Sequence, residues 1–191
     1  MGTFFIVFLT VLGVAIVAFL VYGNSIPEAW EVKSSTTVHA DREFLYDYLS
    51  CIKNWEEWTI WSRDVNPTFE FKYEGVESGA GATQCWKAKN QFGKTKICGG
   101  DRPNNITYMF SFGHGHHMMK GVIELKPRGC ETEVVWSAKG DAGKNPARKI
   151  AAKMMAPYMQ KDFEGGLKRL KAIFADGQRG NLDCEEKKVP E

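Results

Sequence analysis

The sequence predicts an α+β protein in which an N-terminal transmembrane helix precedes one domain built from an antiparallel sheet and a long C-terminal helix. Three observations predict this fold class. Residues 4–22 form an apolar run without charge, residues 68–139 hold six strand-like segments separated by turn residues, and residues 145–174 carry apolar side chains at helical spacing. A chain of 191 residues is long enough for one domain with a sizeable core.

The first segment, Phe4 to Tyr22, reads FFIVFLTVLGVAIVAFLVY and has 19 residues. As a helix it would be about 28 Å long, close to the thickness of the hydrocarbon core of a bilayer. A cleaved signal peptide is the alternative, because residues 23–25 (GNS) would suit cleavage, but such peptides carry a basic residue before a shorter apolar run. We expect residues 1–23 to be a single-pass membrane anchor and residues 24–30 to be a linker. The flanking basic residues are few, so the membrane side of the domain stays undecided.

The folded domain is expected over residues 31–176, followed by a disordered tail at 177–191 that lacks an apolar pattern. The domain opens with a strand at Val32–Val38 and a short amphipathic helix capped by Asp41. Six strands in about seventy residues then predict an antiparallel meander. Alternation along the last strands places one set of apolar side chains on a common interior face: Ile106, Tyr108, Phe110, Phe112, Ile123, Leu125, Val134, Trp136 and Ala138.

The long C-terminal helix begins at Asn145-Pro146, a cap residue followed by proline at the first helical position. Pro157 should kink or divide this helix, because proline lacks the backbone N–H that the helix needs. Gly165 and Gly166 leave a patch without side chains, where another backbone or a ligand can come close.

Charge and cysteine spacing exclude several classes of protein. The chain has 25 basic and 23 acidic residues with no long basic run, so we expect no nucleic-acid partner. The five cysteines show no paired metal-ligand spacing: Cys51, Cys85, Cys98, Cys130 and Cys184. If residues 90–93 form a hairpin turn, Cys85 lies opposite Cys98 and Trp86 opposite Ile97. An exported domain could then form a Cys85–Cys98 disulfide, and two free buried thiols are the alternative.

Three histidines, His114, His116 and His117, are the most tempting metal ligands in the sequence. They lie between two expected strands, where alternate residues point in opposite directions, and no cysteine or carboxylate lies near them in sequence. We therefore favour a solvated hairpin loop and expect neither a metal nor a cofactor.

Four segments together resemble a known superfamily: NWEEWTIWS at residues 54–62, YEGVESGAGATQCW at 73–86, ETEVVWSAKGD at 131–141 and KDFEGGLKRLKAI at 161–173. In this order they resemble the START-related SRPBCC superfamily, which has the birch pollen allergen fold. Within it they are most similar to the polyketide cyclase/dehydratase-like family of bacterial proteins. The resemblance covers roughly residues 31–175. It implies a helix-grip domain, in which a seven-stranded antiparallel sheet curls around the long helix and encloses a largely apolar cavity.

The resemblance suggests which residues meet a ligand. In this fold we expect Trp55 to belong to the core, and Trp58 or Trp61 to approach the cavity. Aromatic and methionine side chains suit ligands of variable shape, although ordinary core packing is the alternative for all of them. The candidate ligand-binding residues are Trp58, Trp61, Trp86, Tyr108, Phe110, Trp136, Met154 and Tyr158.

These observations lead to three functional hypotheses. The preferred one is a membrane-tethered binding module that holds a hydrophobic small molecule, such as a lipid or polyketide-like compound, without changing it. The alternatives are a cyclase, dehydratase or hydrolase acting on such a ligand, and a protein-interaction domain with a collapsed cavity. The sequence shows no acid/base pair suited to catalysis, because the carboxylates considered lie at turns or on outward faces: Asp64, Glu74, Glu124 and Asp141.

Overall fold

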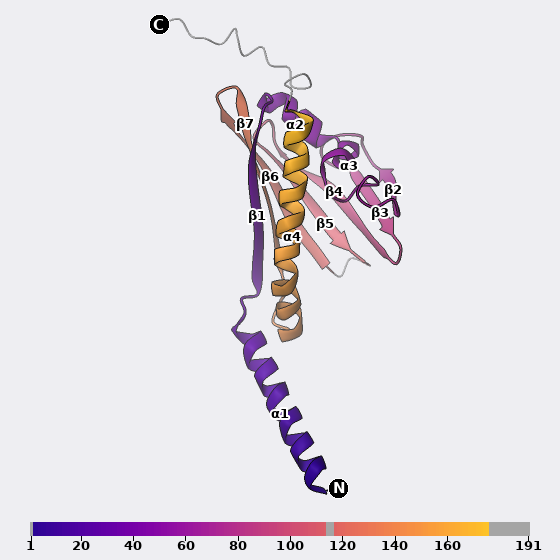
Figure 1. Cartoon of the computed structure of the whole chain (residues 1–191). Helices are drawn as coiled ribbons and strands as arrows, with labels where there is room; N and C mark the ends of the chain where they lie inside the picture. The colour runs from indigo at the N-terminus through magenta and orange to yellow at the C-terminus, as the bar shows by residue number, and fades with distance from the viewer. Residues whose placement is uncertain (1, 114–116, 176–191) are drawn as a thin grey trace, which may run out of the picture.

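In the computed structural model, which describes residues 2–113 and 117–175, an N-terminal helix is followed by one α+β domain (Figure 1). Helix α1 (Gly2–Ser25) is followed by β1 (Ala29–Val38), then by α2 (Arg42–Ser50), the 3₁₀ turn η1 (Ile52–Asn54) and α3 (Trp55–Trp58). The remaining elements are β2 (Phe69–Glu74), β3 (Thr83–Ala88), β4 (Gln91–Asp101), β5 (Asn105–Phe112), β6 (His117–Arg128), β7 (Glu131–Asp141) and α4 (Pro146–Ile173).

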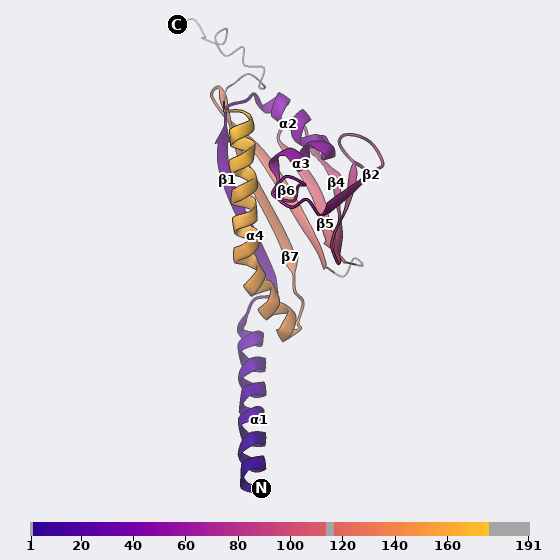
Figure 2. The same cartoon turned by 45° about the vertical axis from the view of Figure 1, so that its right-hand side comes forward.

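The seven strands form one antiparallel sheet in the order β1-β7-β6-β5-β4-β3-β2. Helix α4 runs along this sheet beside β1, while α2 and α3 lie at the end of the domain opposite α1 (Figures 1 and 2). The predicted fold class, a seven-stranded helix-grip domain with a long C-terminal helix, is confirmed. The expected interior positions of β5, β6 and β7 are buried, except that Phe112 is partly exposed.

Both predicted helix starts are capped as the sequence indicates. The Asp41 carboxylate accepts a hydrogen bond from the backbone N–H of Glu43 at 2.8 Å, and the Asn145 side chain accepts one from Ala147 at 2.9 Å. Pro157 was expected to kink or divide the long helix, and it does not divide it, because α4 continues through this residue to Ile173. Pro157 is exposed, so its ring meets solvent.

Three aromatic residues of the sheet each lie directly opposite a glycine on the neighbouring strand. Trp86 is paired with Gly93, Tyr108 with Gly121, and Trp30 with Gly140. A Cβ atom at any of these glycines would lie within 2.4 Å of the facing aromatic ring. The three rings therefore lie directly against the backbone of the neighbouring strand. In a curved sheet, glycine at these positions leaves room for the large side chains.

The register of β3 and β4 corrects the expected disulfide geometry. Cys85 is paired with Lys94 rather than Cys98, because the strands continue to Ala88 and Gln91 around a two-residue turn. In this register the Trp86 ring lies over Gly93. In the register expected from the sequence, Trp86 would instead have faced the side chain of Ile97. Cys98 lies at the register shift after Ile97, and both cysteines are free thiols. The predicted Cys85–Cys98 pairing is therefore wrong.

Helix α1 is charge-free and exposed, and it is long and apolar enough to cross a membrane, although a signal sequence would share these properties. Its last turn packs against the start of α4. Gly23 is buried there, and a Cβ atom at this position would lie 2.5 Å from the Cβ atom of Pro146. Lys153 of α4 donates a hydrogen bond to the hydroxyl of Tyr22 at 3.1 Å. The tail expected at 177–191 lies outside the described residues.

Candidate functional site

The half of the interior farther from α1 is filled by aromatic rings. Trp58 and Trp136 have ring centroids 4.7 Å apart, and Trp136 stacks on Phe163 of α4 at 3.9 Å with an interplanar angle of 2°. The indole N–H of Trp136 donates to the hydroxyl of Tyr108 at 2.6 Å. Trp55 is buried and its indole donates to the backbone carbonyl of Leu49 at 2.8 Å, as expected for a core residue.

Gly166 makes this packing possible, because a Cβ atom there would lie 2.9 Å from the Trp136 ring and 3.5 Å from the carbonyl oxygen of Trp58. The sequence indicated that another backbone or a ligand can come close at Gly165 and Gly166, and at Gly166 the backbone of Trp58 and Thr59 does so. Trp61 borders this packed region: it is only partly buried, and its ring stacks on Phe110 with centroids 5.4 Å apart. Phe110 in turn contacts Phe112 at 4.4 Å.

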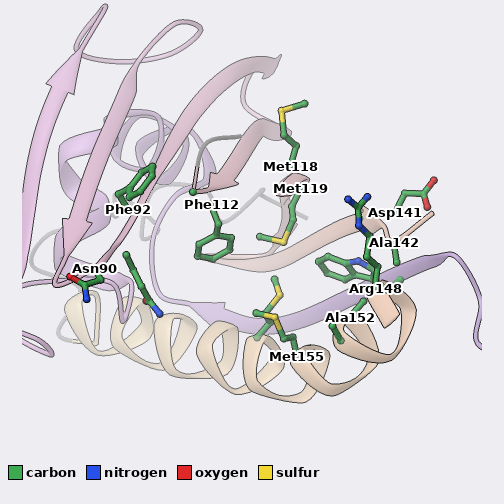
Figure 3. Close-up of a pocket in the computed structure, with 16 residues that line it drawn as sticks. Asn90, Phe92, Phe112, Met118, Met119, Asp141, Ala142, Arg148, Ala152 and Met155 are labelled. Atoms are coloured by element: carbon green, nitrogen blue, oxygen red, sulfur yellow. The ribbon is translucent and has the colours of Figure 1, made fainter. Parts of the chain in front are cut away.

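The half of the interior nearer α1 contains a cavity of about 570 Å³. Its walls come from the β3–β4 turn, the end of β5, the start of β6, the end of β7 and the first turns of α4, all at the end of the domain from which α1 extends (Figure 1). The described lining residues are Trp30, Asn90, Gln91, Phe92, Phe112, Gly113, Met118, Met119, Gly140, Asp141, Ala142, Arg148, Ala151, Ala152, Met155 and Met159. In Figure 3, Phe112 and Met119 project from the sheet toward Met155 on the helix.

The side chains that α4 presents to the sheet explain why one half is hollow. Along the packed half the helix presents Phe163, Leu167 and Leu170, all buried. Along the cavity it presents Ala151, Ala152 and Met155 in the first turns. Small side chains cannot reach the sheet, so the space remains open, and methionine is flexible enough to adapt to molecules of different shape.

The chemical character of the cavity is apolar. Among the described lining residues only Asp141 and Arg148 are ionisable, and both are exposed. One oxygen of Asp141 accepts a hydrogen bond from the backbone N–H of Gly143 at 2.7 Å, which stabilises the turn before α4. The cavity can therefore remove an apolar molecule from water but offers few groups for acid/base chemistry.

Strongly perturbed side chains lie elsewhere in the domain. Burial, together with a hydrogen bond to the carboxylate of Glu56, raises the pKa of Tyr73 to about 12, and burial also raises the pKa of Tyr108. Burial raises the pKa of Asp162 on α4 as well. None of these three lines the cavity. The described residues contain no cluster of potential metal ligands, and the histidine side chains at 114–117 lie outside the described part.

The eight candidate residues from the sequence fall into two groups in the structure, and none is among the described residues that line the cavity. Met154 and Tyr158 lie on the outer face of α4 and are 66% and 70% exposed. The other six lie together in the aromatic interior: Trp58, Trp61, Trp86, Tyr108, Phe110 and Trp136. A role in ligand binding stays a prediction for all eight. Phe112 connects the two regions, because it lines the cavity and packs on Phe110 and Trp86.

Trp30 is one of the lining residues that sequence reasoning missed, because it was assigned to the linker at residues 24–30. In the structure it belongs to β1 and rests on Gly140. An available signal was its position two residues before Val32, on the same face of a strand that needed only to be extended.

Comparison with known proteins gives both a family and a fold. Residues 29–175 match the model of a family described as polyketide cyclase / dehydrase and lipid transport. No curated protein matches the chain at a significant level. A norcoclaurine synthase point mutant of Thalictrum flavum, solved with a transition-state analogue, is similar over 78% of this chain and 96% of its own, with 12% identity and a TM-score of 0.59.

Two bacterial protein structures resemble this chain to a comparable degree. A structure from Chromobacterium violaceum has 15% identity and a TM-score of 0.55, over 78% of this chain and 98% of that one. The Aha1 protein of Colwellia psychrerythraea, described as a dimer, has 12% identity and a TM-score of 0.54, over 78% and 98% respectively. At such identities the likeness shows the fold alone. From the family match over residues 29–175, the chain belongs to the polyketide cyclase/dehydrase and lipid transport family.

Proposed function

We propose that this protein is a membrane-tethered binding module that holds a hydrophobic small molecule, such as a lipid or polyketide-like compound, without changing it. The observation that carries the proposal is the apolar cavity of about 570 Å³, which has few ionisable groups in its described lining. A volume of this order suits a small-molecule site, and methionine and aromatic walls suit an apolar ligand.

The position of the cavity supports tethering as part of the function. It lies at the end of the domain from which α1 extends, so an α1 that spans a bilayer would hold the cavity close to lipid (Figure 1). Three apolar side chains of its rim are exposed, namely Phe92, Met118 and Met155. Exposed apolar residues at the rim of a cavity are typical of a surface that receives an apolar ligand.

The binding test is mass spectrometry of small molecules extracted from the full chain purified from membranes. The wild-type protein should retain an intact apolar compound in stoichiometric amounts. Ala151→Phe should reduce the retained amount at least about fivefold, because the ring would occupy the cavity beside Met155. The matched control is Ala172→Phe, an exposed position near the other end of α4.

An equal amount of compound in both variants would contradict binding in this cavity. Recovery of a chemically altered compound after incubation would favour the enzyme hypothesis instead.

The tether has its own test, which is extraction of membranes at alkaline pH. The full chain should remain in the membrane pellet, because removing a charge-free helix such as α1 from a bilayer is strongly unfavourable. A soluble mature protein whose N-terminus lies near Ile26 would show instead that the segment is a cleaved signal sequence.

A further inference from the structure

A second cleft lies beside the cavity, between α4 on one side and the linker and the start of β1 on the other. It has a volume of about 630 Å³. Its described lining residues are Ser25, Ile26, Pro27, Ala29, Trp30, Glu31, Val32, Lys149, Ala152, Lys153, Ala156, Pro157 and Gln160. Trp30 and Ala152 line both spaces, so the cleft and the cavity share a wall.

Among the charged residues that the structure describes in this cleft, Lys149 alone is buried. Its side chain lines the cleft and the residue is only 6% exposed. Neither a side-chain hydrogen bond nor an ion pair joins Lys149 to any of the described residues. The ammonium nitrogen itself is not fully buried, so it opens onto the cleft. The packed stem limits its hydration, and no described ion pair supplies a counter-charge. A bound anion would supply that counter-charge.

Lys153 provides a second cation in the same cleft. It lies one helical turn after Lys149, so the two side chains share a face of α4. Two like charges at this spacing repel each other unless an anion lies between them. The one carboxylate among the described lining residues is that of Glu31, and it is paired with Lys139 at 3.4 Å. The cleft therefore has excess positive charge.

The position of the cleft at the end of α1 indicates a source for the anion. Lys153 donates to the Tyr22 hydroxyl at 3.1 Å, and its ammonium nitrogen lies 5.1 Å from the centre of the Tyr22 ring. Tyr22 ends the apolar run of residues 4–22, a position at which tyrosine is typical of the interface between hydrocarbon and head groups. Lys149 and Lys153 would then lie at the level of lipid phosphates.

We propose that this cleft binds a phosphate group through Lys149 and Lys153, and that an anionic phospholipid head group supplies it. The inference rests in part on the proposed tether, and it names the lipid class that would lie beside the cavity. Because Trp30 and Ala152 separate the cleft from the cavity, a phospholipid held by its phosphate would have its acyl chains next to the apolar space.

The test uses native mass spectrometry of the full chain released from nanodiscs that contain equal amounts of phosphatidylglycerol and phosphatidylcholine. The wild-type protein should retain phosphatidylglycerol in preference to phosphatidylcholine. Lys149→Met should reduce the retained phosphatidylglycerol about tenfold while leaving the chain folded, because methionine removes the cation and keeps an apolar stem of similar length. The control is Lys168→Met, an exposed lysine of the same helix outside the cleft, which should retain the wild-type preference.

A second arm distinguishes the source of the phosphate. The thermal midpoint of the wild-type protein in phosphatidylcholine nanodiscs is measured with and without inorganic phosphate, using chloride at the same ionic strength as the reference. A rise specific to phosphate and absent from Lys149→Met, without preference for phosphatidylglycerol, would support the cleft as a phosphate site and overturn the lipid source. The same lipid preference and phosphate response in Lys149→Met as in wild type would overturn the site.

Failure of this proposal can be told apart from failure of the proposed function. The compound retained in the cavity is measured by extraction from the same preparations, and its loss depends on Ala151→Phe rather than on Lys149→Met. A protein that retains an apolar compound but shows no lipid preference and no phosphate response contradicts only the cleft proposal.

Discussion

The two halves of the interior differ in what α4 presents to the sheet. Farther from α1, Phe163 stacks on Trp136 at 3.9 Å and the space is closed by rings from α3 and the sheet. Nearer to α1, Ala151 and Met155 face a cavity of about 570 Å³. The same sheet and the same helix therefore support a packed core in one half and an open space in the other. Stability should depend on the first half, and binding on the second.

The largest expected effect comes from removing a ring in the packed half. Phe163→Ala should lower the free energy of unfolding by about 3–5 kcal/mol, because it opens a hole against the Trp136 indole. Met155→Ala, in the hollow half, should cost less than about 1 kcal/mol, since this side chain is 52% exposed and already borders open space. Denaturant unfolding of the full chain in detergent micelles, followed by tryptophan emission, measures both.

Equal losses in these two variants would show that the hollow half contributes to stability as much as the packed half. The comparison would then fail, and a cavity that collapses in solution would be the better description, as in the protein-interaction hypothesis.

A smaller effect is expected from one hydroxyl in the packed half. Tyr108→Phe leaves the indole N–H of Trp136 without its acceptor at 2.6 Å, in a site that water does not reach. An unsatisfied buried donor costs about 1–3 kcal/mol. The matched control is Tyr158→Phe, which removes a hydroxyl from a residue that is 70% exposed and should change stability by less than about 0.5 kcal/mol.

If both tyrosine variants unfold at the same denaturant concentration as the wild type, the hydrogen bond between Trp136 and Tyr108 makes no net contribution to the free energy of unfolding. The packed half would then be held by ring contacts alone.

The strands, the helices and the direction of their apolar faces could be predicted from sequence because they depend on local patterns. Alternation in β5 and β7 and the caps at Asp41 and Asn145 are properties of neighbouring residues. The pairing of Cys85 could not be predicted, because the register depends on the length of the turn and on which residue must face Trp86. Gly93 is that residue, and its role is visible only across the strands.

The position of the cavity was harder to predict, because it depends on where no side chain fills the interior. Strand alternation shows that Trp136 and Phe110 point inward, but it does not show whether another side chain fills the space in front of them. Here α3 and Phe163 fill it. The cavity lies where α4 carries alanines, and the relevant signal was the change from Ala151 and Ala152 to Phe163 and Leu167 along one face.

Trp30→Phe should have the smallest effect on stability. It is also the sharpest test of where a ligand binds. All six tryptophans lie outside α1, but Trp30 is the one that lines the cavity among the described residues. A fatty acid such as palmitate, added to the full chain in neutral nanodiscs after removal of any retained compound, should shift the emission of Trp30 saturably as it displaces water. Trp30→Phe should remove most of that shift and cost less than about 1 kcal/mol of stability, because a phenyl ring can still rest on Gly140.

Trp61→Phe is the matched variant in the packed half, since Trp61 is also partly buried but stacks on Phe110 instead of lining the cavity. If the ligand enters the hollow half, Trp61→Phe should leave most of the emission shift in place. If Trp61→Phe removes the shift and Trp30→Phe keeps it, the ligand lies among the aromatic residues that the sequence indicates, and the packed half must open to admit it. Such an opening would expose the rings packed against Trp136, so the ligand would also have to weaken the contact between Trp136 and Phe163 on which stability is expected to depend.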